Sequence, residues 1–154
     1  MDKQENSLLL DLYKLYVEMA DRVSERRLQY NKFYMTLLSG LLVILSFITN
    51  KEHPEIADPY QSSIFIAFGL MGCLICLTWF YNIRSHRQLN SKKFEVIHEI
   101  ERDLPYPLYA REWKLLGEGK DSKKYFQLTK VEKYIPVILS IPYLILTILG
   151  LINF

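Results

Sequence analysis

The chain has 154 residues, of which 50% are hydrophobic and 23% are charged, and its formal net charge is +2. Three stretches, residues 33–49, 64–81 and 134–154, contain no acidic or basic side chain. Each has the length of roughly 17–25 residues that a membrane-spanning helix needs, the first only just, which excludes an ordinary soluble core.

Residues 7–32 form a predicted helical arm that leads into the first apolar stretch without an intervening Gly or Pro. We therefore expect one long helix from about residue 7 to residue 49. The arm has a broad apolar face of the kind that packs against other helices. That face consists of two adjacent stripes, Leu8, Leu12, Leu15 and Met19 in one and Leu9, Tyr13, Tyr16, Ala20 and Val23 in the other.

Residues 50–63 are expected to be a short outer loop, with Gln61-Ser62-Ser63 capping the second span. The second span, residues 64–81, continues into helix-forming residues as far as Asp103. Pro105 and Pro107 then stop the helix, because a residue before proline is driven out of the α region. A second long helix is therefore predicted.

Residues 107–116 predict a short helix that ends at Gly117 and Gly119. We expect this hairpin to brace the two long helices, with Trp113 packed against them. A capping box at residues 129–132 starts the helix that becomes the third span, residues 134–154.

The Lys and Arg residues lie on one side of the predicted spans. Eighteen of the nineteen are in residues 1–32 or in residues 82–133, and the outer loop has only Lys51. Basic residues flank spans on the cytoplasmic side, so the N-terminus is expected in the cytoplasm and Phe154 outside. The predicted fold is an all-α integral membrane protein with three transmembrane helices, two of them extended into the cytoplasm, in a single helical unit over residues 1–154.

Small residues on the first two spans are candidate helix-packing positions, because small side chains let backbones approach closely in lipid. They are Ser39 and Gly40 on the first span and Gly69, Gly72, Cys73 and Cys76 on the second. The commoner role is packing within one subunit, and the alternative is packing between subunits. Three short spans make a thin bundle, which favours a homo-oligomer. The cysteine pair lacks a second pair or a nearby His, which favours packing over redox or metal chemistry.

Two basic clusters flank the spans. They are Arg26 and Arg27 before the first span, and Arg84, Arg87, Lys92 and Lys93 after the second. Contact with anionic lipid, worth about 1 kcal/mol per residue, is the commoner explanation. A contact with a partner protein, or a phosphate site for a nucleotide or RNA, is the alternative.

Nothing in the sequence indicates an enzyme, a cofactor or a metal site. His86 and His98 lie near acidic residues, but no third and fourth ligand has suitable spacing. No nucleophile–base pattern, P-loop or dinucleotide fingerprint occurs. The spans lack the ionisable residues of proton-coupled transporters, although an oligomeric pore lined by small and apolar residues remains compatible with them.

Residues 24–31 and the start of the first span, Phe33–Gly40, resemble the SLATT-type small membrane effectors of bacterial anti-phage systems. Residues 89–113 are similar to small bacterial membrane proteins, so the likeness covers about residues 8–113. The resemblance implies a pore or membrane-perturbing subunit that a partner protein switches on when it senses infection. The third span departs from the two-span pattern of those effectors.

Two functions follow as hypotheses. The first is an oligomeric, non-enzymatic pore or membrane-perturbing effector in phage defence, controlled by a cytoplasmic partner protein or by a nucleotide or RNA signal. The alternative is a non-conducting anchor or scaffold that recruits a soluble defence enzyme to the bilayer.

Overall fold

The computed structural model describes residues 3–49, 54–121, 123–125 and 128–153. The helices are α1 (Lys3–Ile48), α2 (Pro54–Glu101), α3 (Leu108–Leu115), the short 3₁₀ helix η1 (Gly117–Gly119), α4 (Leu128–Glu132) and α5 (Tyr134–Ile152). The chain is 89% helical, and no strand occurs in the described residues, so the all-α fold is confirmed. α1, α2 and α5 each contain a segment long and apolar enough to cross a membrane.

The two long helices extend beyond the spans, as the sequence predicts, but α2 begins earlier than expected. The prediction of an outer loop as far as residue 63 is wrong, because residues 54–63 already belong to α2. Residues 61–63 therefore lie inside the helix and do not cap it. Pro54 suits the first helical position, since its φ is fixed near the helical value and its missing N–H would have no intrahelical partner there.

The chain divides into two compact units, and both long helices contribute to each of them. We call Gln29–Ile83 with Lys133–Phe154 the apolar unit, and Met1–Leu28 with Arg84–Glu132 the polar unit. The borders lie close to the predicted ends of the spans. Each unit is described by itself below.

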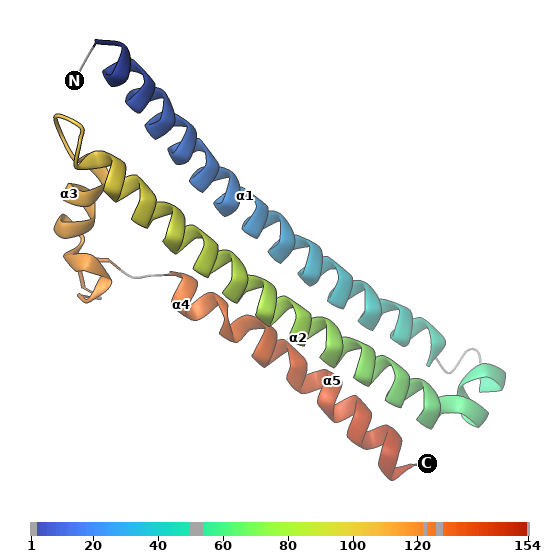
Figure 1. Cartoon of the computed structure of the whole chain (residues 1–154). Coiled ribbons are helices and arrows are strands. Elements are labelled where there is room, and N and C mark those ends of the chain that lie inside the picture. The colour runs from blue at the N-terminus through green and yellow to red at the C-terminus, as the bar shows by residue number, and fades with distance from the viewer. Residues whose placement is uncertain (1–2, 50–53, 122, 126–127, 154) are drawn as a thin grey trace. The chain divides into compact units, whose positions relative to one another are not determined.

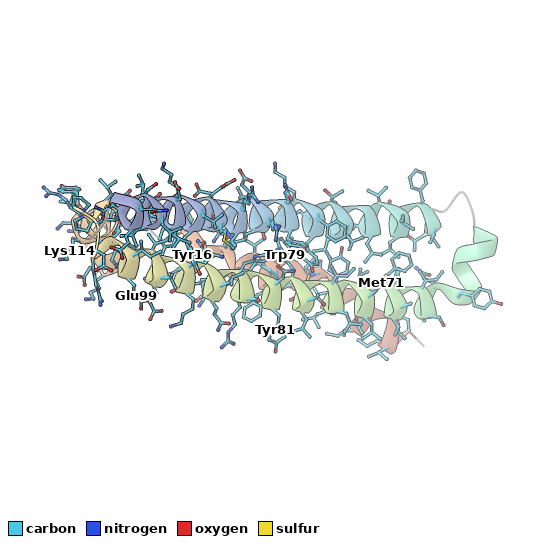
Figure 2. All side chains as sticks on the ribbon, turned by 45° about the horizontal axis from the view of Figure 1, so that its top comes forward. Tyr16, Met71, Trp79, Tyr81, Glu99 and Lys114 are labelled. Carbon is cyan, nitrogen blue, oxygen red and sulfur yellow. The ribbon has the colours of Figure 1, made fainter. Side chains whose placement is uncertain are left out.

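In the apolar unit, α1 and α2 run side by side, and α5 packs against them (Figure 1). The buried core contains Leu38, Leu41, Cys76, Trp79, Ile83 and Tyr143. Trp79 points toward α1 and stacks on Tyr34 with ring centroids 5.8 Å apart, whereas Tyr81 points away from α1 (Figure 2). Two buried polar groups are satisfied inside this core. The Trp79 indole N–H donates to Asn31 Oδ1 at 2.8 Å, and the Tyr143 hydroxyl donates to the Leu38 carbonyl at 2.7 Å.

In the polar unit, one of the two apolar stripes of α1 is packed and the other is open. Ala20 and Val23, from the second stripe, are buried, and Ile97 of α2 is fully buried. The chain turns after α2, and α3 then ends at Leu115, shortly before Gly117 and Gly119, close to the prediction. Both glycines have positive φ, 69° and 67°, a conformation that costs a residue with a Cβ about 1–2 kcal/mol.

Candidate functional site

The predicted small residues fall into two groups with different surroundings. Gly69 and Gly72 of α2 lie directly against α5, where a Cβ at Gly69 would meet Thr147 and one at Gly72 would meet the Tyr143 ring. Cys76 is buried in the same core, Cys73 packs against it, and both thiols are free. These four residues therefore pack the helices of one subunit.

Ser39 and Gly40 have no such neighbours. Ser39 is exposed, and a Cβ at Gly40 would meet no atom within 4 Å. Thr36, Val43 and Ser46 are also exposed on α1, while the buried positions of this segment are Leu38, Leu41 and Leu45. At 3.6 residues per turn, the small and polar residues lie on the side of the helix away from the core. This small-residue face of α1, residues 36, 39, 40, 43 and 46, is largely uncovered in the single chain.

The basic residues after the second span do not form one site. Arg84, Arg87 and Lys92 line a shallow hollow on the surface of α2. Lys92 is paired with Glu95 at 2.6 Å, and Lys93 turns toward α1, where its ammonium lies 5.6 Å from the centroid of the Tyr16 ring.

Two neighbouring arginines of α1, Arg26 and Arg27, also differ in their surroundings. Arg26 is exposed, whereas Arg27 is largely covered and its Nε lies 3.7 Å from Oε2 of Glu132. Burial, together with the charges of Arg27 and Arg26, lowers the pKa of His86 below its ordinary value of 6.5. This end of the polar unit therefore carries positive charge without a protonated histidine at neutral pH.

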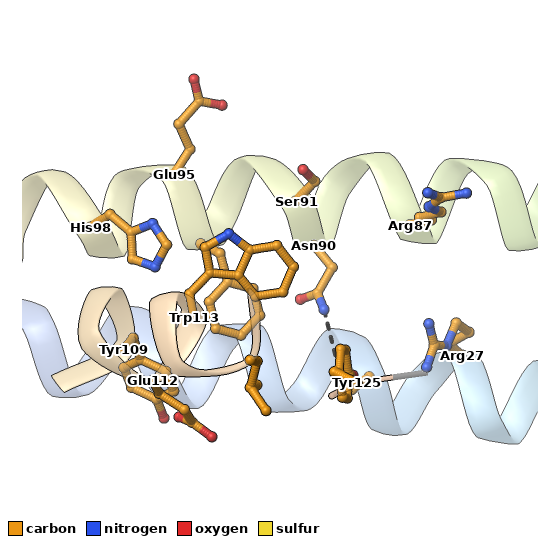
Figure 3. Close-up of a pocket in the computed structure, with 13 residues that line it drawn as sticks. Arg27, Arg87, Asn90, Ser91, Glu95, His98, Tyr109, Glu112, Trp113 and Tyr125 are labelled. Carbon is orange, nitrogen blue, oxygen red and sulfur yellow. Dashed lines mark hydrogen bonds between the residues drawn. The ribbon is translucent and has the colours of Figure 1, made fainter. Parts of the chain in front are cut away.

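A cavity of about 710 Å³ lies within the polar unit, between α1, α2 and the α3 hairpin. Arg27 and Arg87 stand at one end, and His98 and Tyr109 at the other, with the indole of Trp113 between them (Figure 3). The lining also includes Ser24, Asn90, Ser91, Phe94, Glu95, Glu112, Leu116 and Tyr125. The volume is in the range of small-molecule sites. Trp113, which the sequence placed against the long helices, lines this cavity and stays 37% exposed.

Glu101 is a residue whose role the sequence did not reveal. Its side chain is only 1% exposed. The carboxylate accepts hydrogen bonds from the Tyr13 hydroxyl at 2.9 Å and from the backbone N–H groups of Tyr109 and Ala110 at 2.7 and 2.9 Å. Burial and the neighbouring carboxylate raise the pKa of Tyr13, so the phenol remains a donor. The sequence feature that could have indicated this role is the position of Glu101 just before a proline-rich turn.

The remaining stripe of α1 is apolar and uncovered. Leu8 is 63% exposed, Leu12 42%, Leu15 49% and Met19 39%. These four residues, called the open stripe below, belong to the polar unit. Single exposed leucines are ordinary on a protein surface, but a continuous row along one helix indicates an interaction surface. No group of three or more metal-binding side chains converges in the described part of the chain.

The fold and these surfaces define a multi-pass α-helical membrane protein with uncovered faces suited to assembly. A family model, the octameric membrane protein family (8xMP), matches residues 10–152. The chain belongs to this family of membrane proteins that assemble from several subunits.

The match includes the third span, which the SLATT-type resemblance left unexplained, and that resemblance is not supported by it. No curated protein and no solved structure matches the chain.

Proposed function

We propose that eight copies of this chain assemble around a common axis in the bacterial inner membrane and control its permeability. The polar unit would lie in the cytoplasm and receive a signal, and Phe154 would lie outside. The number of subunits follows the name of the family. A signal opens the assembly only if it binds the open arrangement more tightly than the closed one.

The observation that carries this proposal is the small-residue face of α1. A helix face that only met lipid would have no need of Thr36, Ser39 and Ser46, and all three are exposed. Facing a shared axis, they would offer hydroxyl groups to passing water and ions, with Val43 among them as an apolar constriction that can gate by dewetting. The free space at Gly40 would let helices of neighbouring subunits approach closely.

Ion flux from liposomes containing the purified protein tests this function. Ser39→Leu, which places a larger apolar side chain on the proposed lining, should lower the flux several-fold. Ser140→Leu on α5 is the matched control and should leave it unchanged, because the Ser140 hydroxyl donates to the carbonyl of Val137 in its own helix and lies outside the proposed lining. Well-folded assemblies that never conduct, with or without cell lysate from phage-infected bacteria, would refute the pore.

The open stripe favours the second function, a non-conducting scaffold that recruits a soluble enzyme. Its residues would then bind that enzyme and not a second copy of this chain. In that case Leu12→Glu abolishes recruitment in a pull-down, while the assembly size and the membrane permeability stay as in the wild type.

The setting in phage defence comes from the resemblance alone and is tested separately. Deletion of the gene should lower the resistance of the host to phage infection, and expression of the Ser39→Leu variant should fail to restore it. Equal plaque counts with and without the gene would refute the defence role and leave the permeability proposal standing.

A further inference from the structure

We propose that the cavity of the polar unit binds a nucleotide, a ligand with a phosphate group and a flat base that carries an exocyclic amino group. The inference deepens the proposed function, because the ligand would be the signal that the polar unit receives. Every residue of the site belongs to the polar unit, so the site is complete within one chain.

The phosphate end is set by two arginines on different helices. Arg27 comes from α1 and Arg87 from α2, and they stand at the same end of the cavity (Figure 3). Glu132 lies beside Nε of Arg27, whereas Arg87 has no ion pair among the residues that the structure describes. Planar guanidinium groups bind phosphate oxygens through two hydrogen bonds at once. The pair therefore offers more positive charge than the single carboxylate beside it neutralises.

Trp113 offers a ring on which the flat base of the ligand would stack. Phe94 and Tyr109 pack edge to face on one another with ring centroids 5.7 Å apart. The Trp113 indole makes no ring contact with any described aromatic side chain, and it lies in the middle of the cavity (Figure 3). Nucleotide bases stack readily on uncovered aromatic rings.

Asn90 supplies the group that would recognise the amino substituent. Its Nδ2 donates to the Ser24 hydroxyl at 3.4 Å, which orients the amide. Its Oδ1 is buried and has no hydrogen-bond partner among the described residues. A buried amide oxygen without a donor is unfavourable and uncommon in native structures. Because Asn90 lines the cavity, a rotation of its amide toward the cavity would let an exocyclic amino group of a bound base provide the missing donor.

Glu95 and Glu112 do not oppose this placement of the phosphate. Glu95 points out of the cavity (Figure 3) and pairs with Lys92 at 2.6 Å. Glu112 lies near Tyr109, at the end away from the two arginines (Figure 3). The cavity thus has a basic end and a less basic end, which fixes the direction of an asymmetric anionic ligand.

Binding is measured by calorimetry with the full chain in lipid nanodiscs. The probes are CTP, UTP, ATP and GTP, with cytidine, inorganic triphosphate and dihexanoyl phosphatidylglycerol as the partial ligands. We expect saturable binding of the nucleotides that carry an amino group, with one site per chain. Cytidine, triphosphate and the short-chain lipid should bind at least tenfold more weakly. CTP should bind about tenfold more tightly than UTP, which has an oxygen in place of the amino group.

Variants connect the binding to the named side chains. Arg87→Gln and Trp113→Leu should each weaken CTP binding at least tenfold. The matched control Arg84→Gln, one turn away on α2 and outside the cavity, should stay within threefold of wild type. Trp113→Phe keeps a stacking ring and should lose less binding than Trp113→Leu. Asn90→Leu should abolish the preference for CTP over UTP. Circular dichroism and assembly size verify that each variant is folded.

Three results would overturn the proposal. The first is that none of the four nucleotides saturates a site. The second is that inorganic triphosphate binds as tightly as CTP. The third is that the short-chain lipid binds more tightly than any nucleotide and that its binding depends on Arg87. A bound nucleotide without ion flux refutes only the pore, and flux without nucleotide binding refutes only this site.

Discussion

At the scale of single residues, Glu101 explains how the polar unit holds its helices together. A carboxylate this deeply buried is stable only when its oxygens are hydrogen-bonded. Its partners are the Tyr13 hydroxyl of α1 and two N–H groups in the first turn of α3. Such N–H groups have no partner inside their own helix, and the helix dipole favours a negative charge there. One side chain thus ties α1, α2 and α3 to each other.

Replacing Glu101 by Ala should loosen α3. The change removes the acceptor of three hydrogen bonds and leaves buried donors unpaired, which costs about 3 kcal/mol or more. Limited trypsin digestion should then cut faster after Arg111 and Lys114, both in α3. Glu99→Ala, at an exposed position of the same helix, should leave the cleavage rate within twofold of wild type. Equal rates for Glu101→Ala and wild type would contradict the role of Glu101.

His86 predicts that the stability of the folded protein depends on pH. Its pKa in the folded protein is lowered, so the unfolded chain takes up the proton first as the pH falls. The stability that comes from a neutral His86 is present in full above the ordinary pKa of 6.5 and is lost as the pH falls through the lowered value. Melting temperatures in detergent should therefore drop between pH 7.5 and pH 5. His86→Gln should make that drop smaller, and an identical drop in both proteins would refute the assignment.

At the scale of elements, the small residues of the spans serve two purposes. Those of α2 let α5 approach closely, because a Cβ at Gly69 or Gly72 would overlap Thr147 or Tyr143. Gly150 of α5 does the same against Ser62 and Ile66 of α2. In lipid such close approach supplies the packing that holds helices together. The α1 face around Gly40 takes no part in this and is available to a neighbouring subunit.

Gly72→Ala and Gly40→Ala should therefore have opposite effects on the subunit fold. The first forces a methyl group into the Tyr143 ring and should cost about 1–3 kcal/mol. The second fills open space and should stabilise the helix by about 0.5–1 kcal/mol, the usual preference for Ala over Gly. Unfolding in mixed micelles measures both. A Gly72→Ala protein as stable as wild type would show that α5 does not pack where the structure has it.

The helices were predictable from sequence because each signal is local. The absence of breakers predicted that α1 and α2 would continue beyond the spans, and Pro105 and Pro107 predicted where α2 ends. The start of α2 was missed because Pro54, which suits a first helical turn, was interpreted as part of a loop. The sequence also could not predict which of the two apolar stripes of α1 is packed and which is exposed, because both have similar apolar residues at helical spacing.

The cavity was predictable only in part, because it depends on how α3 folds back onto the long helices. A phosphate site was the alternative interpretation of the basic residues after the second span, beside contact with anionic lipid. The structure places Arg87 in the cavity but Arg84 outside it. Nothing in the sequence singles out Asn90, whose importance is the buried oxygen without a partner. Glu101 was likewise an ordinary charged residue until its burial was known.

At the scale of the whole molecule, we expect the open stripe to connect a single chain to an assembly. Lipid can cover the apolar outer surface of the spans, but it cannot cover leucines in a unit as charged as the polar unit. A ring of identical subunits uses two different patches on each copy, so the open stripe would meet another surface of the next subunit. Burying one leucine contributes about 1.5–3 kcal/mol, and the stripe is repeated at every interface of the ring.

Leu12→Glu with Leu15→Glu should therefore break the assembly into smaller species. Native mass spectrometry from detergent measures the subunit number, which we expect to be eight for wild type and lower for the double variant. Lys14→Gln is the control, because it makes the same change in charge per site at an exposed polar residue outside the open stripe. A double variant that remains octameric would place the interface elsewhere. If it also lost a bound soluble protein, the open stripe would belong to a recruited partner, and the scaffold function would replace the pore.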